Sequence, residues 1–517
     1  MKKTFAWLLI IMLTGVLSIP VSAAAASSYT PVGIEIDSEK LEVEAYLVSG
    51  RTLVPLRAIF EKLQAEVKWE QATKTVTATK GSTVIELRIN DVTASVNKKK
   101  VTLDVPPMLI NQATFVPLRF VSEALGAEVA FDEKRKAVTI STTASGCNGG
   151  QVHTGTIDPA GETWTACGSP HFVKGDFLVE GLESPVLTIE AGAVVRFEKD
   201  ASLVVGNEEP GGLIINGSTS KPVVLTADSS GPNAGFWKGI RFGEAAVRDK
   251  ASITGARIEY AGEEDKGALY LGAAGLQLNM TVKDSEFKNS LFAGIHMVDN
   301  SRLSENSGNI KITGTKAGTY GGGFPIVTYL LGSHLVPNGT YTGNDIDAVR
   351  ITGTNTYDIL TKSATWRNVG VPYDMEITVT VEGPSNPVLT IEPGVTTKWG
   401  PDTFLEIANS NGGGLKAVGT KEKPIVFSGN LEKQSGWMGI VFGPKAVSSR
   451  IQLQYASIEY ALYGITIYED LGPIVKDSSF KNNEIGVYMP LYEPGQTDYR
   501  TGHGNTFEGN GQDQNID

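Results

Sequence analysis

An eight-residue segment that occurs twice constrains this chain more than any other feature. Pro185-Val-Leu-Thr-Ile-Glu-Ala-Gly192 returns as Pro387-Val-Leu-Thr-Ile-Glu-Pro-Gly394, at an offset of 202 positions (387 − 185 = 202). Each copy alternates apolar and polar residues, as a half-buried strand does, and ends at a turn. A strand-and-turn unit that returns at a long spacing is typical of stacked repeats. We therefore expect this chain to be a stack of β units.

The two halves of the tract share further landmarks. Trp237 aligns with Trp437, and Val282-Lys-Asp-Ser-Glu-Phe-Lys-Asn289 aligns with Val475-Lys-Asp-Ser-Ser-Phe-Lys-Asn482. The strands are short, Gly, Asn and Asp separate them, and no convincing amphipathic helix interrupts them. A sandwich stays an alternative, but this pattern favours a parallel β-helix. We predict a mostly β protein with a first half at 169–350, which carries an insert at 300–337, and a second half at 351–517.

Repeated residues within these halves suggest their places in a coil. We expect Phe287 and Phe480 to stack inside. We expect Asn289 and Asn482 to lie at bends and to join neighbouring coils through side-chain ladders.

Several motifs of the second half also carry a family resemblance. Leu-Thr-Ile-Glu-Pro-Gly-Val395, Gly414-Leu-Lys-Ala-Val-Gly-Thr420, Lys423-Pro-Ile-Val-Phe427 and Trp437-Met-Gly-Ile440 resemble those of bacterial right-handed parallel β-helix surface proteins. The resemblance implies the pectin lyase-like fold, which these proteins share with polysaccharide lyases and glycosidases. Because one fold hosts many activities, it implies no particular reaction.

The N-terminal module, at 30–143, is itself duplicated. Arg51-Thr-Leu-Val-Pro-Leu-Arg57 returns as Ala113-Thr-Phe-Val-Pro-Leu-Arg119, an offset of 62 (119 − 57 = 62). The pattern of each copy predicts a strand that ends at a proline, then a short helix with one apolar stripe, and then further strands. Trp69 and Phe131 occupy equivalent positions after the helices, and we expect both to pack against them as core residues.

The paired Val-Pro-Leu-Arg segments resemble the copper amine oxidase N-terminal-like domain of exported bacterial proteins. The resemblance implies a small accessory module. Residues 1–150 contain no His, and no Asn-Tyr-Asp/Glu quinone motif occurs in the chain. Because Cu(II) prefers nitrogen ligands, we predict no copper, no other cofactor and no amine oxidase activity.

The N-terminus has the pattern of an export signal. Lys2 and Lys3 precede an apolar stretch, and Val21-Ser22-Ala23 fits a cleavage site, which predicts a signal peptide at 1–23. Removing it changes the net charge from −12 to −14 (−12 − 2). Such an acidic chain is a poor partner for nucleic acid. With no second long apolar run, we predict a secreted or cell-wall-associated protein without a membrane span.

The Gly/Thr-rich linker at 144–168 contains both cysteines of the chain. Cys147 and Cys167 predict a disulfide, which an exported protein can keep. The alternative is a pair of thiols in a loop. A metal site formed with His153 and His171 lacks the usual close ligand spacing.

The best local candidates for catalysis are Asp345, Asp347 and Arg350, since residues two apart on a strand face the same way. However, Asp347 recurs as Asp513 in the second half, which favours a turn or ladder role. His296 aligns with Tyr488, and we expect a surface residue there. Exposed tyrosines could stack on sugar rings or simply on one another along the coil, namely Tyr463, Tyr468, Tyr488 and Tyr492.

These observations lead to a function hypothesis. We expect a non-catalytic structural or binding protein that presents its β-helix to a cell-wall or extracellular polysaccharide. The alternative is an extracellular polysaccharide lyase or glycoside hydrolase, for which acids and a basic residue would cluster on one face. Ca²⁺ enters only if the protein is a lyase.

Overall fold

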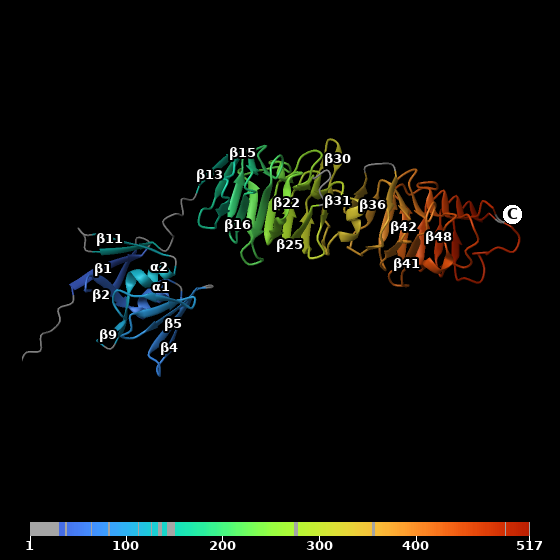
Figure 1. Cartoon of the computed structure of the whole chain (residues 1–517). Coiled ribbons are helices and arrows are strands. Elements are labelled where there is room, and N and C mark those ends of the chain that lie inside the picture. Colours follow the sequence, from blue (N-terminus) through green and yellow to red (C-terminus); the bar gives the residue numbers. More distant parts are fainter. Residues whose placement is uncertain are drawn as a thin grey trace, which may run out of the picture. The chain divides into compact units, whose positions relative to one another are not determined.

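The computed structural model describes residues 30–36, 39–63, 65–80, 83–111, 113–125, 127–132, 137–141, 150–272, 278–353, 357–491 and 493–515. The chain forms two compact units, residues 1–145 and 146–517. Figure 1 shows the two short helices among the strands of the first unit and the stacked strands of the second. Among the described residues, no helix has the length and apolar character needed to cross a bilayer.

The described residues of the first unit form two sheets and two helices. The seven-stranded sheet has the order β11-β12-β1-β2-β3-β10-β9, and the five-stranded sheet has the order β4-β5-β6-β7-β8. The bounds are β1 Thr30–Ile36, β2 Glu39–Val48, β3 Arg51–Pro55, α1 Leu56–Lys62, β4 Glu66–Glu70, β5 Thr75–Lys80, β6 Thr83–Arg88, β7 Thr93–Val96, β8 Lys99–Thr102, β9 Met108–Ile110, β10 Ala113–Pro117, α2 Leu118–Ala124, β11 Glu128–Asp132 and β12 Ala137–Ser141.

The elements of this unit repeat at the offset found in the sequence. β10 begins 62 residues after β3 (113 − 51), and α2, β11 and β12 follow α1, β4 and β5 at the same offset. β3 and β10 pair antiparallel, with Val54 opposite its own equivalent, Val116. Leu53 faces Pro117 and Pro55 faces Phe115, so the two copies meet about a local two-fold axis.

The core of the first unit lies beneath the helices. Ile59 and Phe60 of α1 and Val121 of α2 are fully buried, as the apolar stripe predicts. The core prediction for Trp69 and Phe131 was wrong, because these side chains are 46% and 44% exposed. Both lie on β4 and β11, which are terminal strands of their sheets and therefore have a neighbouring strand on one side.

The second unit is a parallel β-helix in which each strand pairs with the equivalent strand of the next coil. Three ladders form the first half. Ladder A is β14-β16-β19-β22-β25, ladder B is β15-β17-β20-β23-β25-β28, and ladder C is β15-β18-β21-β24-β26-β31-β33. The bounds are β13 Val152–Thr156, β14 Glu162–Trp164, β15 His171–Val179, β16 Val186–Glu190, β17 Val194–Phe197, β18 Ser202–Val205, β19 Gly211–Asn216, β20 Val223–Ala227, β21 Gly239–Phe242, β22 Ala246–Thr254, β23 Ala256–Glu259, β24 Leu269–Leu271, β25 Asn279–Lys288, β26 Ala293–Met297, β27 Arg302–Leu303, β28 Gly308–Thr313, β31 Phe324–Tyr329, β32 Gly339–Thr340 and β33 Val349–Thr352.

The second half repeats the three ladders. Ladder A′ is β35-β38-β41-β44-β47, ladder B′ is β36-β39-β42-β45-β48-β50, and ladder C′ is β34-β37-β40-β43-β46-β49-β51. The bounds are β34 Tyr357–Leu360, β35 Ala364–Trp366, β36 Tyr373–Met375, β37 Thr378–Val381, β38 Val388–Ile391, β39 Thr396–Trp399, β40 Phe404–Ile407, β41 Gly414–Val418, β42 Ile425–Gly429, β43 Gly439–Phe442, β44 Ile451–Gln454, β45 Ala456–Glu459, β46 Tyr463–Ile467, β47 Val475–Lys476, β48 Ser479–Lys481, β49 Ile485–Tyr488, β50 Thr506–Glu508 and β51 Gln512–Gln514, with a short 3-10 turn, η2, at Ser448–Arg450.

The two halves join with a change of face. Phe197 of ladder B and Trp399 of ladder B′ are equivalent at the 202-residue offset (399 − 197). Yet ladder B′ continues ladder C, because β33 pairs with β36, with Val349 opposite Tyr373. Each ladder of the second half therefore lies one face away from its equivalent in the first half.

Large rings fill the centre of the coil. Phe197 stacks on Trp237 with ring centroids 3.8 Å apart, and Trp399 stacks on Trp437 at 5.3 Å. The indole nitrogens of the two buried tryptophans Trp237 and Trp437 donate to the main-chain oxygens of Glu259 and Glu459, at 2.8 and 2.9 Å. The predicted burial of Phe287 and Phe480 is confirmed.

The repeated polar residues lie at turns. Asn289 and Asn482 have φ of 52° and 54°, and Asp284 and Asp477 have φ of 50° and 47°. Asn and Asp tolerate this left-handed region better than most residues, which explains why they recur. The ladder contact lies one residue further on, where the Nδ2 of Asn483 donates to the Oδ1 of Asn510 at 3.1 Å.

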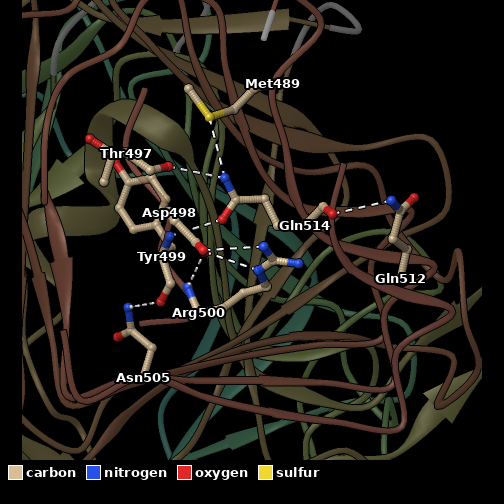
Figure 2. A network of polar contacts seen from close by, with 8 residues as sticks. All are labelled: Met489, Thr497, Asp498, Tyr499, Arg500, Asn505, Gln512 and Gln514. Atoms are coloured by element: carbon tan, nitrogen blue, oxygen red, sulfur yellow. Dashed lines mark hydrogen bonds and ion pairs between the residues drawn. The ribbon is translucent and has the colours of Figure 1, made fainter. Parts of the chain in front are cut away.

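A polar network joins side chains and main-chain groups near the last described strands of the coil (Figure 2). Buried Gln514 donates to the main-chain oxygen of Thr497 at 3.0 Å and accepts from the amide of buried Tyr499 at 2.9 Å. The Nδ2 of Asn505 donates to the main-chain oxygen of Tyr499 at 3.1 Å. The two contacts of Gln514 fasten the segment that follows β49 to β51, the last described strand of ladder C′.

The insert at 300–337 adds two small elements. A two-stranded hairpin joins β29, Ala317–Gly318, to β30, Gly321–Gly322, and a 3-10 helix, η1, spans Leu330–Leu335. Between them runs β31, which belongs to ladder C. The insert therefore contains three coil strands, β27, β28 and β31, together with this hairpin and η1, most of whose residues are buried.

Candidate functional site

The two predicted catalytic aspartates have separate structural partners. Asp345 accepts from the Nζ of Lys316 at 2.8 Å and from the amide of Ala317 at 3.0 Å. The hydrogen bond from Lys316 holds the pKa of Asp345 below its usual range. Asp347 accepts from the amides of Gly343 and Asn344 at 3.0 and 2.8 Å. Asp345 thus fastens the β29–β30 hairpin, and Asp347 closes a turn, as its recurrence suggested.

Arg350 belongs to a different group of side chains. It lies on β33, and its Nε donates to the Oδ2 of Asp374 at 2.8 Å. It also pairs with Glu376, and its guanidinium lies 4.2 Å from the centre of the Phe324 ring. Each of the three predicted residues is tied to its own partners, and a catalytic role for them stays a prediction.

The expectation that His296 is a surface residue was wrong. Its exposed fraction is 9%, and every residue of β26 is buried. Tyr270 and Phe292 pack against the imidazole with ring centroids 5.3 and 5.2 Å away. Burial lowers the pKa of His296 to about 4, so the ring is neutral at pH 7.

The predicted tyrosine row is divided in the structure. Tyr463 and Tyr488 stack on each other with centroids 4.3 Å apart, which is the ordinary stacking alternative. Tyr468 is 43% exposed, and Tyr492 lies outside the described residues.

The structure describes part of the predicted linker, from residue 150 onward. Cys167 has no free thiol, but Cys147 lies outside the described residues, so the disulfide between them stays a prediction. His153 and His171 lie side by side, with Nε2 and Nδ1 3.1 Å apart, and His171 also contacts the main-chain oxygen of Thr165 at 2.9 Å. Desolvation by burial lowers the pKa of both histidines. Among the described residues, no group of three or more His, Cys, Asp or Glu could hold a metal ion.

A different surface combines the features of a binding site. We call it the A′ face: the outward side chains of ladder A′ and the residues of the two cavities beside them. The registers place Thr365 beside Thr390, Thr390 beside Lys416, and Lys416 beside Gln452. Their inward neighbours, such as Leu389, Leu415 and Ile451, are buried in the coil. Strand alternation therefore directs this row of polar side chains to solvent.

Two cavities flank this row and share Lys416. One, of about 370 Å³, is lined by Glu305, His334 and Arg367 together with residues of β35 and β38. The other, of about 410 Å³, is lined by Arg450, Gln454 and Lys476 together with residues of β44. The insert contributes His334 from η1, so it also shapes one end of this face.

The A′ face is basic in an acidic protein. Among the residues that line the two cavities, Arg367, Lys416, Arg450 and Lys476 are cationic, whereas Glu305 is the one carboxylate. Burial, together with Arg302 and Arg367, lowers the pKa of His334. A concentration of positive charge against a net charge of −12 raises the local attraction for anions.

The equivalent face of the first half has a different character. At the 202-residue offset, Ile214 takes the place of Lys416, and Ser252 follows it in the ladder where Gln452 follows Lys416. Lys416 and Arg367 (Thr165 at the same offset) are thus particular to the second half. The other two cations have basic counterparts, since Lys283 aligns with Lys476 and Lys250 donates to Ser184 as Arg450 donates to Asn386. The A′ face was not predicted from the sequence because its successive cations are 26 to 49 residues apart (476 − 450 = 26, 450 − 416 = 34, 416 − 367 = 49), and only the coil register brings them together. The exchange of Ile for Lys between twin strands was the signal that could have found it.

Comparison with known proteins identifies the first unit. Residues 34–140 match the family model described as copper amine oxidase N-terminal domain. The predicted family resemblance of this unit is therefore confirmed. The donor set does not fit copper, since residues 1–150 contain no His and the described residues contain no metal-ligating group of three.

One relative among curated proteins is described as a protease inhibitor from Brevibacillus choshinensis. It is 32% identical over 144 residues, which is 28% of this chain and 43% of that protein. The match thus spans less than half of the relative's own length, and the function of the whole relative does not carry over.

Proposed function

We propose that the protein is a secreted or cell-wall-associated, non-catalytic binding protein that holds an acidic polysaccharide along the A′ face. The observation that supports this most is the continuous polar row of ladder A′, with Lys416 at its centre and two basic cavities beside it. Neighbouring coils are about 4.8 Å apart, so regularly spaced donors face any extended polymer that follows the stack.

The chemistry of the row favours an anionic, hydroxyl-rich ligand. Thr365 and Thr390 offer hydroxyls, Gln452 offers an amide, and Lys416 and Lys476 offer ammonium groups. Carboxylate or phosphate groups of the polymer would pair with the cations, and sugar hydroxyls would bond to the neutral groups. The signal peptide lies outside the described residues, so export enters this proposal from the sequence.

The test is co-sedimentation of the mature chain with insoluble acidic polysaccharide. Calcium-gelled polygalacturonate is the acidic probe, a fully methyl-esterified pectin gel is the neutral one, and cell wall with and without its phosphate polymers separates the two anion types. We expect binding to the acidic probes that weakens as salt rises. We expect Lys416→Ile, which copies Ile214, to reduce affinity roughly fivefold, the equivalent of about 1 kcal/mol for one exposed charge contact.

The matched control is Lys199→Ile, an exposed lysine in a turn of the first half. Equal losses in both variants would refute a role for the A′ face. The soluble fraction is analysed for sugar fragments in the same experiment. Fragments released at enzymatic rates would refute the non-catalytic proposal in favour of the lyase or hydrolase alternative.

A further inference from the structure

The copper amine oxidase N-terminal domain contains two grooves that the proposed function does not use. Groove 1, of about 650 Å³, lies between α1 and β4, and groove 2, of about 460 Å³, lies between α2 and β11. Both volumes are within the range of small-ligand sites, roughly 300–1,000 Å³. Each groove is built by both copies, since Ala113 of β10 lines groove 1 and Arg51 of β3 lines groove 2.

The two grooves are equivalent. Nine lining positions of groove 1 recur in groove 2 at an offset of 62, in one direction or the other. The antiparallel pairing of Val54 with Val116 relates them by the local two-fold axis. At these nine positions the two grooves have the same plan, with Phe131 of groove 2 in the place of Trp69 of groove 1.

An exposed aromatic ring recurs in both grooves. Trp69 is 46% exposed, and Phe131 is 44% exposed. The residues opposite them in the sheets, Val76 and Val138, are 2% and 3% exposed. Packing of the core therefore explains the valines but not two half-exposed rings. The indole nitrogen of Trp69 donates to the side-chain oxygen of Gln71 at 2.7 Å, which holds the ring in one orientation.

A charge-balanced pair lies on the helix that borders each groove. Arg57 and Glu61 on α1 correspond to Arg119 and Glu123 on α2, each pair one helical turn apart. Arg119 and Glu123 are 3.7 Å apart. Groove 2 adds Arg51 and Asp104, which are 2.6 Å apart. Each groove thus carries equal numbers of cationic and anionic side chains.

This balance indicates the kind of ligand. A charged ligand would be attracted to one member of each pair and repelled by the other. Hydroxyl groups both donate and accept, so they can use the guanidinium and the carboxylate together. The aromatic face and the apolar floor suit the apolar face of a sugar ring. We propose that the domain is a two-site binder, each groove taking one segment of an uncharged saccharide.

The experiment is isothermal titration of the mature full chain with cellohexaose and, separately, N-acetylchitohexaose. We expect a stoichiometry of two for at least one of these sugars. Trp69→Ala should reduce it to one, and Trp69→Ala combined with Phe131→Ala should abolish binding. Trp69→Phe should keep the stoichiometry at two, because it gives groove 1 the ring that groove 2 already has.

The control is Leu109→Ala, which removes another exposed apolar side chain of the same unit, 60% exposed. It should leave the stoichiometry at two, as should Lys416→Ile, which separates this proposal from the A′ face. The proposal is overturned if neither sugar binds, or if Trp69→Ala leaves the stoichiometry unchanged. Saturable binding of an extended peptide along β4 or β11, in place of either sugar, would also overturn it.

Discussion

Replacing His296 should remove a defined part of the acid sensitivity of the β-helix. The imidazole is 9% exposed, with Tyr270 and Phe292 against it, and its pKa is about 4 instead of the ordinary 6.5. Burial lowers this pKa, while the carboxylate of Asp265 and a hydrogen bond to its main chain oppose the shift and Lys266 adds to it. The folded protein therefore holds His296 neutral over a range where the unfolded chain protonates it.

The sign of the effect follows from proton counts. Between pH 6.5 and about 4, the unfolded state binds more protons at this position than the folded state, so stability falls as pH falls. The lowering of this pKa from 6.5 to about 4 corresponds to about 3 kcal/mol of stability, most of which has been lost by pH 4.5. Above pH 7 the contribution no longer changes.

The variant His296→Tyr, which copies Tyr488 of the second half, tests this value. Urea unfolding of the β-helix at pH 7 and pH 4.5 gives the loss of stability on acidification for each protein. We expect the parent to lose about 2–3 kcal/mol more than the variant, because all other titrating groups are common to both. Equal losses would refute the reasoning, as would an NMR titration of ¹³C-labelled histidine in which His296 titrates near 6.5.

Three further predictions concern other contacts. Gln514→Ala leaves the buried amide of Tyr499 without its acceptor and should destabilise the last coil by about 1–3 kcal/mol; unchanged hydrogen exchange at that amide would contradict the assignment. Trp437→Phe loses the bond to the main chain of Glu459 and should cost roughly 1–3 kcal/mol, measured by urea unfolding, with an unchanged midpoint as the contrary result. Asp345→Ala should release the β29–β30 hairpin to limited proteolysis without affecting binding of acidic polysaccharide; loss of a polysaccharide-cleaving activity would instead support a catalytic Asp345.

The repeats allowed the architecture to be predicted from the sequence, because a residue that occurs in both copies indicates a turn or a packing position that each coil needs. The recurrence of Asp284 and Asn289 reflects left-handed turns, and that of Trp237 reflects a buried ring with a fixed hydrogen bond. The burial or exposure of single residues was harder to predict. The burial of His296 depends on rings that lie on other segments, namely Tyr270 and Phe292.

The exposure of Trp69 has a similar cause. Its apolar alternation with Val67 predicts a buried face, but the position of β4 at the end of its sheet leaves that face half covered. The A′ face escaped prediction for a related reason. Its residues become neighbours through coil lengths that differ from turn to turn, and a sequence pattern gives strand alternation but not the number of residues in each coil.

The change of face at the junction of the two halves means that the duplication does not place equivalent surfaces end to end. Ladder B′ continues ladder C, and the strands of each coil follow in the same order, so ladder A′ lies in line with ladder B. Along the coil, the A′ face therefore continues into the outward residues of ladder B and not into those of ladder A, its equivalent. The duplication therefore lengthens the coil without lengthening the A′ face. Ile214 and Lys416 lie on different faces of the coil, so the exchange of one for the other does not interrupt a continuous surface.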